Sequence, residues 1–234
     1  MTEGEAVKIT KISQQVKRKD RYSIYVDEKY SFSLNEYQLA SSGLRSGKEL
    51  TQEELDEFIG EAEFGRAYER SLNYVMIRPR SEKEIKDYLV RTFLYPKPKS
   101  YVDKNGKRHI IKKEVDKEAT NNMIERVIER LNEKGYINDE SFTKSWVQSR
   151  MFHKKPSKRK LEQELYKKRI KSEIIATVLQ NSELNEKDNL LMLVKKKQKI
   201  VRYQDDQKLI PYLLRQGFNY DDIRKVLSES TQEI

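Results

Sequence analysis

A pattern of apolar positions recurs after 48 residues in the C-terminal half of this chain. Counted from Leu161 and again from Leu209, apolar residues follow at offsets of 4, 9, 17 and 18. Each copy predicts a helix, a tight joint and a second helix. A fixed period of this size is typical of arrays of helical modules, in which no module is large enough to bury its apolar face alone. The repeated positions are Leu165, Ile170, Val178 and Leu179 in the first copy and Leu213, Phe218, Val226 and Leu227 in the second.

The first 50 residues lack the helical spacing of the repeat; apolar and polar residues alternate there with a period of two. Such alternation, broken by polar turns, predicts a small antiparallel β meander. Asn35 is expected to cap a short helix that ends near Gly43. The alternating runs are residues 7–12, 22–26 and 30–34.

The middle of the chain predicts a first helical module. Thr51 and Glu54 form a capping box before a long helix that Pro79 ends. Ser81 and Glu84 form a second capping box, which opens a shorter helix.

A third helix of this module carries apolar residues at helical spacing over 123–131, and Gly135 is expected just past its end. Residues 93–115 interrupt the helical pattern. They contain an Asn105-Gly106 turn between two short apolar runs, which predicts a β-hairpin. We interpret this stretch as an insertion of about 25 residues into the module, judged against the helical repeat.

The patterns together predict a mainly α protein. Its architecture is an elongated array of three tandem three-helix modules, with a small N-terminal antiparallel β meander and a β-hairpin inserted in the first module. The predicted segments are an N-terminal β-rich extension at 1–50, a first helical module at 51–138 with the insertion near 93–115, a second module at 139–183 and a third at 184–234.

The positive charge of the chain indicates which classes of binding partner to expect. The chain has 48 Lys and Arg against 38 Asp and Glu, a formal charge of +10. The stretch from Glu140 to Lys171 contains eleven basic residues and only three acidic ones. Such clustering predicts binding to nucleic acid or to an acidic protein surface, and a simple solvated helix face is the alternative. The candidate binding residues are Arg78, Arg80, Lys144, Arg150, Lys154, Lys155, Lys158, Arg159, Lys160, Lys167, Lys168, Arg169, Lys195, Lys196, Lys197 and Arg202.

Aromatic residues interleave with the basic run. Trp146, Phe152 and Tyr166 offer rings on which bases could stack. The helical spacing of Trp146 and Phe152 favours a place in the core instead. Arg78 and Arg80, which follow the first long helix, could contact a phosphate or carboxylate, or complement the helix dipole.

The sequence contains no arrangement of residues that predicts catalysis, a metal site or a cofactor. There is no cysteine, and the 8 glycines form no phosphate-binding loop. The acidic pairs Asp205-Asp206 and Asp221-Asp222 stand at predicted helix starts, where carboxylates cap free N–H groups. His109 and His153 have no second ligand at metal spacing. We therefore expect a protein that is not an enzyme.

No run approaches 18 consecutive apolar residues, and the N-terminus has no apolar signal-peptide core. The absence of cysteine fits a reducing compartment. These features predict a soluble, cytoplasmic protein with no membrane partner.

The segment 135–142, Gly-Tyr-Ile-Asn-Asp-Glu-Ser-Phe, leaves one helix, turns and caps the next at Asp139. It resembles the segment between the first and second modules of RecX proteins, bacterial modulators of the RecA recombinase in DNA repair and homologous recombination. Three other segments resemble the same family in the same order, so that the resemblance covers nearly the whole chain. These segments carry Ala67, Leu72, Arg78, Ser81, Ile85 and Leu89; Lys158, Leu161, Leu165 and Ile170; and a strand-rich entry from Ile9 to Leu50.

The resemblance implies a non-enzymatic modulator, an inhibitor of RecA. Such a protein lies in the groove of the RecA–single-stranded DNA filament, bridges protomers, and damps ATP hydrolysis and strand exchange. The implied partners are the RecA filament and single- or double-stranded DNA, bound by a monomer through the candidate basic residues. Two alternatives remain: a free-standing DNA-binding protein of tandem helix-turn-helix-like modules, and a scaffold whose basic face is incidental.

Two features depart from the family pattern. The insertion at 93–115 is not usual in the family, and the joint of the second module has Arg169 where a glycine is common. The equivalent joint of the third module has Gly217.

Overall fold

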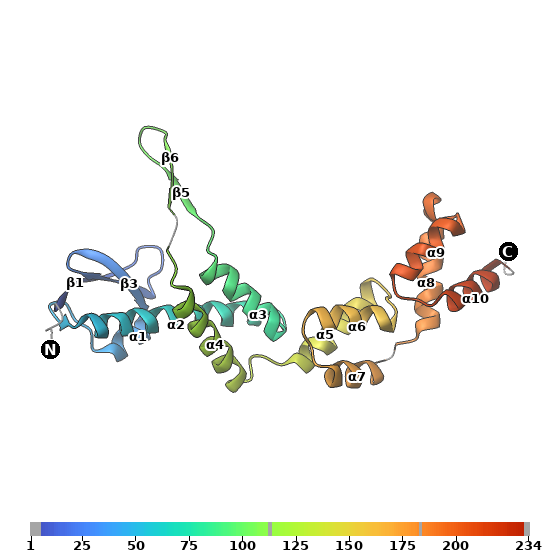
Figure 1. Cartoon of the computed structure of the whole chain (residues 1–234), viewed down its shortest axis with the longest axis horizontal. Helices are drawn as coiled ribbons and strands as arrows, with labels where there is room; N and C mark the ends of the chain where they lie inside the picture. The colour runs from blue at the N-terminus through green and yellow to red at the C-terminus, as the bar shows by residue number, and fades with distance from the viewer. Residues whose placement is uncertain (1–5, 112–113, 183, 232–234) are drawn as a thin grey trace. The chain divides into compact units, whose positions relative to one another are not determined.

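The computed structural model describes residues 6–111, 114–182 and 184–231. Residues outside this description are 1–5 of the predicted N-terminal extension, 112–113 of the predicted insertion, 183 at the end of the predicted second module and 232–234 at the end of the third. The protein is mainly helical with a small N-terminal antiparallel sheet, as predicted (Figure 1).

The chain divides into two compact units. The first unit comprises Met1–Ile77 and Ile85–Tyr136, and the second comprises Arg78–Glu84 and Ile137–Ile234.

The sheet of the first unit has four antiparallel strands in the order β3-β2-β1-β4. Three of them confirm the predicted meander. The fourth was not predicted, because two residues are too few to show an alternating pattern. Asn35 caps α1 (Glu36–Ser42) in a capping box, and Gly43 ends the helix in a left-handed conformation, as expected. The strands are β1 (Val7–Gln14), β2 (Arg21–Val26), β3 (Lys29–Asn35) and β4 (Glu49–Leu50).

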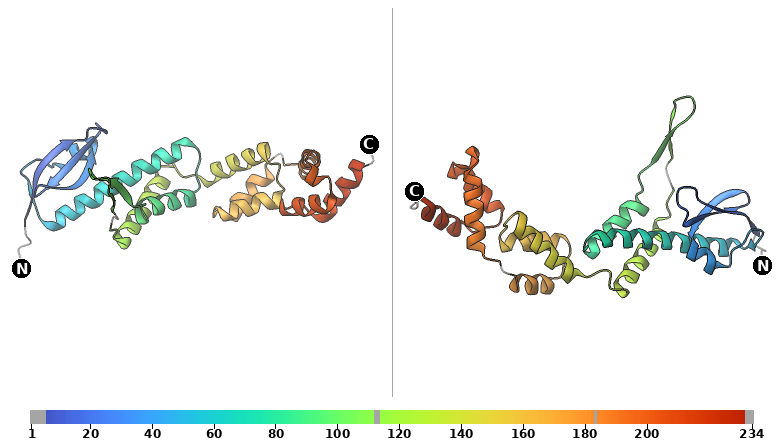
Figure 2. Two further views of the ribbon diagram at one scale, coloured as in Figure 1. Left: turned by 90° about the horizontal axis from the view of Figure 1, so that it is seen from above. Right: turned by 180° about the vertical axis from the view of Figure 1, so that it is seen from behind.

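The sheet is covered by the N-terminal half of α2 (Gln52–Ile77), as Figure 2 shows. Ile24 and Phe32 lie opposite each other on neighbouring strands and pack with Leu55 and Ala62 of the helix. A sheet of short strands is marginal by itself, and the apolar face of the helix supplies the burial that it needs. The capping box of Thr51 and Glu54 that starts α2 forms as predicted.

The first unit also contains α3 (Glu82–Leu89), which straddles its boundary, and α4 (Lys117–Glu133). A π-helical turn, η1 (Val90–Leu94), prolongs α3 and buries Phe93 and Leu94. The non-helical part of the predicted 93–115 insertion therefore begins two residues later, at Tyr95.

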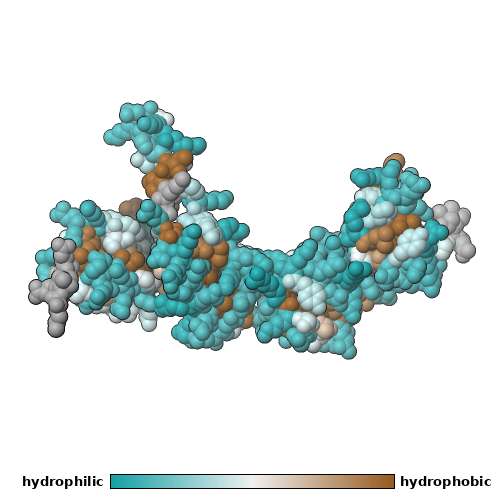
Figure 3. All heavy atoms as spheres, viewed as in Figure 1, coloured by the Kyte–Doolittle hydropathy of each residue, from teal (hydrophilic) through white to brown (hydrophobic). Residues whose placement is uncertain are grey.

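The predicted hairpin is present as β5 (Lys99–Val102) and β6 (Arg108–Ile111). Its tip projects away from α2 and α4 in Figure 1 and in the right-hand view of Figure 2. Val102, Ile110 and Ile111 of the hairpin are exposed apolar residues. Figure 3 shows a brown, hydrophobic surface on the hairpin.

The second unit contains six helices in its described part, arranged as two groups of three with separate apolar cores. All ten positions of the 48-residue repeat are buried, which confirms the interpretation of the pattern. The repeat extends further than predicted, because Ile175 and Ile223 are also equivalent and buried. The helices are α5 (Asp139–His153), α6 (Lys158–Lys167), α7 (Ser172–Gln180), α8 (Glu186–Gln198), α9 (Asp206–Arg215) and α10 (Tyr220–Thr231), with a 3₁₀ turn η2 (Val201–Tyr203).

One predicted cap is wrong. Asn138, not Asp139, caps α5 by accepting a hydrogen bond from the Ser141 N–H. Asp139 is the first helical residue, and its carboxylate accepts a hydrogen bond from the Glu82 N–H at the start of α3. Burial raises the pKa of Asp139, a shift that this hydrogen bond opposes.

Candidate nucleic-acid and protein interface

The candidate basic residues divide into those with partners inside the protein and those without. Arg78, Arg80 and Lys168 gather around one carboxylate, that of Glu84 on α3. Arg78 donates two hydrogen bonds to it, at 2.9 and 3.3 Å, and the Lys168 ammonium lies 2.6 Å away. Burial raises the pKa of Glu84, but the hydrogen bonds from Arg78 and Lys168 outweigh it and hold the pKa below the usual value. These cations help to fix the start of α3 against the α6–α7 joint.

Trp146 organises a second group of partnered cations. Its ring is half-buried against the core of α5–α7, as predicted, and its indole N–H donates to Glu164 at 3.1 Å. The Arg150 guanidinium binds the same carboxylate at 2.6 Å and lies 4.2 Å from the ring centroid, while the Lys168 ammonium lies 5.0 Å from it. Two cations already occupy this aromatic surface, so it is not a free stacking platform.

Other candidates also have internal contacts. The Lys197 ammonium lies over the rings of Tyr203 and Tyr212, and the Arg202 guanidinium lies over Tyr203. Lys160 donates to the backbone carbonyl of Arg215, the last residue of α9. Lys144 forms an exposed ion pair with Glu140, which contributes little energy.

The remaining candidates have no side-chain partner within the described ranges 6–111, 114–182 and 184–231, and most of them lie on or beside α6. Arg159, Tyr166 and Lys167 share the solvent-facing side of the helix, because residues seven or eight positions apart lie within about 80° around the axis. The Tyr166 ring is 54% exposed. We call Lys154, Lys158, Arg159, Tyr166, Lys167 and Arg169 the α6 basic surface. Lys155 next to it, and Lys195 and Lys196 on α8, are the other unpaired candidates.

The predicted place of Phe152 in the core is wrong, because its side chain is 79% exposed. The last turn of α5 directs it away from the face that buries Phe142 and Val147. It lies instead beside a hollow of about 630 Å³ between the end of α5 and the end of α7. Lys144 and Lys155 also line this hollow, so apolar and basic side chains alternate there.

The N-terminus of α6 is held by the other three-helix group of the same unit. Ser157 caps α6 by accepting from the Lys160 N–H, and its hydroxyl donates to the Gln216 carbonyl at 2.9 Å. Gly217, in a left-handed conformation with φ of 90°, allows this approach. A Cβ atom there would lie 2.4 Å from the Ser157 hydroxyl. The backbone that carries Lys158 and Arg159 is therefore fixed by a contact between the two groups.

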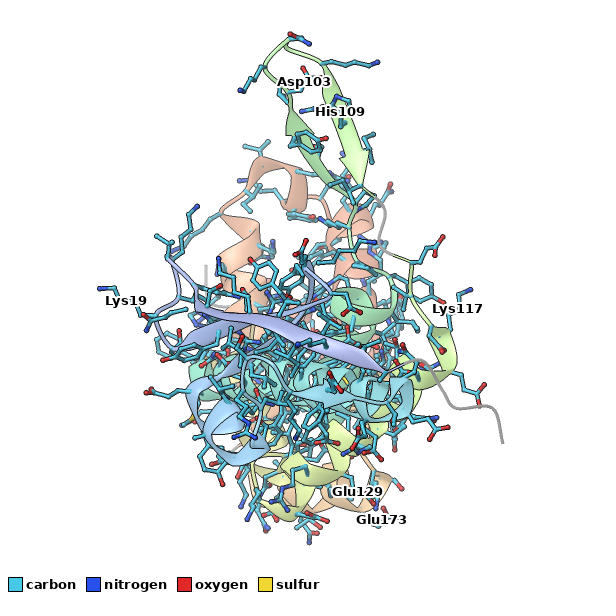
Figure 4. All side chains as sticks on the ribbon, turned by 90° about the vertical axis from the view of Figure 1, so that its left-hand side faces the viewer. Lys19, Asp103, His109, Lys117, Glu129 and Glu173 are labelled. Carbon is cyan, nitrogen blue, oxygen red and sulfur yellow. The ribbon has the colours of Figure 1, made fainter. Side chains whose placement is uncertain are left out.

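The acidic pairs stand at helix starts, as predicted. Asp205 caps α9, and Asp221 and Asp222 lie in the first turn of α10. Within the described ranges, no group of three or more His, Cys, Asp or Glu side chains is arranged to hold a metal ion. His109 pairs with Asp103 across the hairpin at 2.7 Å (Figure 4).

The sequence pattern did not indicate the acidic anchors Glu84 and Glu164, which decide which cations remain free. It also did not single out Arg66 and Arg70 of α2, which face a cavity in the first unit. Their spacing of four residues, which places two like charges side by side on a helix, was the available signal.

No helix in the described part of the chain is both long enough and apolar enough to span a membrane. The chain matches the family model of the regulatory protein RecX N-terminal domain over residues 7–51, and that of the RecX second three-helix domain over residues 138–179.

Curated relatives agree with these matches over nearly the whole chain. A regulatory protein RecX of Listeria monocytogenes serotype 4b (strain F2365) is 32% identical, with 96% of this chain and 97% of the relative covered. One from Clostridioides difficile (strain 630) is 29% identical over 94% of both. A crystal structure of regulatory protein RecX has the same fold, with a TM-score of 0.61 and 24% identity over 95% of this chain and 99% of that one. The chain therefore belongs to the RecX family of regulatory proteins.

Proposed function

We propose that this protein is a non-enzymatic inhibitor of RecA that binds as a monomer in the groove of the RecA–single-stranded DNA filament and damps ATP hydrolysis and strand exchange. Membership of a family whose members regulate RecA supports the choice of partner. The proposed contact is the α6 basic surface, where unpaired cations flank an exposed tyrosine.

The charges of the α6 basic surface carry the proposal. Arg159, Lys167 and Arg169 are exposed and have no internal ion pair in the described structure, so their charges are available to a polyanion. Tyr166, between them on the same side of the helix, can stack on a base of single-stranded DNA. The partnered candidates Arg78, Arg150 and Lys168 are assigned to structure instead, because removing them would leave partly buried carboxylates uncompensated.

The test is inhibition of single-stranded-DNA-dependent ATP hydrolysis by RecA. The variant Arg159→Glu, Lys167→Glu, Arg169→Glu should inhibit at least about tenfold more weakly than the parent, since three attractive contacts become repulsive. The control variant makes the same change of net charge at three exposed positions outside the α6 basic surface, Arg45→Glu, Lys117→Glu and Arg224→Glu. It should inhibit RecA nearly as strongly as the parent protein does. Equal inhibition by both variants would exclude the α6 basic surface.

A second candidate, a free-standing DNA-binding protein, is favoured by the same surface, which needs no RecA to attract a phosphate backbone. The two functions differ in whether RecA increases the affinity of the protein for single-stranded DNA. A RecA regulator should bind the nucleotide-loaded filament far more tightly than it binds the naked oligonucleotide, whereas a free-standing DNA-binding protein should not.

A further inference from the structure

The first unit contains a cavity of about 670 Å³ whose walls come from three separate stretches of the chain. One wall is the edge strand β3 with Tyr30, and a second is α2 with Arg66 and Arg70. The third is formed by the two ends of the inserted hairpin, through Lys97 and Ile111. The two ends of the inserted hairpin therefore contribute to this cavity.

Arg66 is the central group of the cavity. Its guanidinium lies 5.2 Å from the centroid of the Phe93 ring, and its Nε atom is buried without a hydrogen-bond partner among the described residues. Burial lowers the pKa of Arg66; the charge of Glu63 opposes this, and those of Arg70 and Arg21 add to it. A buried donor without an acceptor is unfavourable by about 1–3 kcal/mol, and more when the group is charged. The site is therefore short of negative charge.

The acidic residues nearby supply only part of that charge. Glu69 is bound by Arg18 at 2.6 Å and by Arg21 at 3.2 Å. Glu63 is the one acidic side chain among the described residues that line the cavity. Arg70 and Lys97 are exposed at the mouth and have no ion pair within the described structure. The described lining thus carries more positive than negative side chains.

We propose that this cavity binds a phosphate of single-stranded nucleic acid, with Arg66, Arg70 and Lys97 around the phosphate and Tyr30 beside its nucleotide. The planar guanidinium forks of the two arginines match phosphate oxygens. The volume lies in the range of about 300–1,000 Å³ typical of sites for small organic ligands, more than a lone carboxylate fills. The Tyr30 ring, 57% exposed, adds a surface on which a base can stack. This is a second nucleic-acid contact, outside the α6 basic surface and independent of RecA.

The test is fluorescence anisotropy of a labelled oligothymidylate with the full chain and no RecA. The variant Arg70→Glu, Lys97→Glu changes two exposed residues of the cavity, so folding should be retained, as circular dichroism would verify. The control Arg45→Glu, Lys117→Glu has the same net charge, and neither residue lines the cavity. We expect the affinity to fall at least about tenfold for the cavity variant and less than about threefold for the control. The slope of log K against log salt should become shallower by roughly 0.7, since the cavity holds one phosphate and each phosphate contact on a single strand contributes about 0.7.

An equal loss in both variants would show bulk attraction and would overturn the proposal. The proposal would also be overturned if the cavity variant bound oligothymidylate normally but bound poly-glutamate more weakly. That result would indicate an acidic protein surface as the ligand. Thymidine monophosphate that bound as tightly as the oligonucleotide would indicate a free nucleotide instead. Because no RecA is present, failure here leaves the RecA proposal standing, and that proposal is tested separately with the α6 variants.

Discussion

At the scale of single residues, Glu84 has the largest set of charged partners among the candidate contacts. Its carboxylate, 10% exposed, faces Arg78, Arg80 and Lys168. The change Glu84→Gln should destabilise the protein by about 1–3 kcal/mol, less than for a fully buried ion pair because Arg78 is partly exposed. Urea unfolding at pH 7 measures this loss.

The effect should also depend on pH. The folded state lowers the pKa of Glu84 below its usual 4.5, so the ionised carboxylate stabilises the fold above that value. This stabilisation is lost as the pH falls through the lowered pKa, and the difference from Glu84→Gln should vanish there. Glu129→Gln, at an exposed residue of α4 (Figure 4), should change stability by less than about 0.5 kcal/mol. A loss at Glu84 that persisted at low pH would contradict this account.

Arg169 has two roles that oppose each other. It stands in a left-handed conformation, with φ of 58°, at the joint where the equivalent position of the next repeat is Gly217. The change Arg169→Gly should stabilise the fold by about 0.5–1 kcal/mol, because relief of backbone strain exceeds the added entropy of the unfolded chain. The same variant should bind the filament more weakly, since a cation of the α6 basic surface is lost.

The matched control is Arg159→Gly, which removes a cation from the same surface but within the helix. It should destabilise by about 1 kcal/mol. Thermal unfolding should show that Arg169→Gly stabilises the fold and that Arg159→Gly destabilises it. Filament-binding measurements should show weaker binding for both variants. Loss of stability in Arg169→Gly would be inconsistent with strain at the joint.

At the scale of elements, the contact between the α9–α10 joint and the start of α6 depends on Gly217. Both Gly217 and Gly135 follow a helix in a left-handed conformation, but only Gly217 is crowded, by the Ser157 hydroxyl and the Lys160 N–H. Gly135→Ala should therefore cost about 1–2 kcal/mol for backbone strain alone. Gly217→Ala should cost about 1–3 kcal/mol more, because the two groups of helices must also move apart. Chemical unfolding measures both, and equal losses would argue against the docking contact.

At the scale of the whole molecule, the salt dependence of binding distinguishes a RecA regulator from a DNA-binding protein. Binding to naked single-stranded DNA should weaken steeply, with log K falling by about 0.7 per phosphate contact for each unit of log salt. Binding to the RecA filament should show a shallower slope, because apolar protein–protein burial is not screened by salt. Titrations at several salt concentrations with and without RecA and nucleotide measure the two slopes. Parallel slopes would favour the free-standing DNA-binding alternative.

The sequence by itself determined where most of the helices and strands lie. The 48-residue repeat identified ten buried positions in the second unit, and Asn35, Thr51 and Gly135 marked helix ends that the structure confirms. These predictions succeeded because periodicity, caps and glycine turns are local: the residues that specify them are the residues that form the element. The strand β4 was missed because its two residues are too few to show an alternating pattern and its partner Val7 lies more than 40 residues away.

Only the tertiary structure decided which cations are free. Lys168 and Arg159 look equivalent in the sequence, yet the first is bound by Glu84, 84 positions distant, and the second by nothing in the described structure. The cavity around Arg66 likewise needs walls from β3, α2 and the insertion. Electrostatic partners and cavity walls are set by proximity in space, which a local pattern does not encode. The positive charge of this protein could therefore be read from its sequence, but the surfaces that present it arise only from the fold.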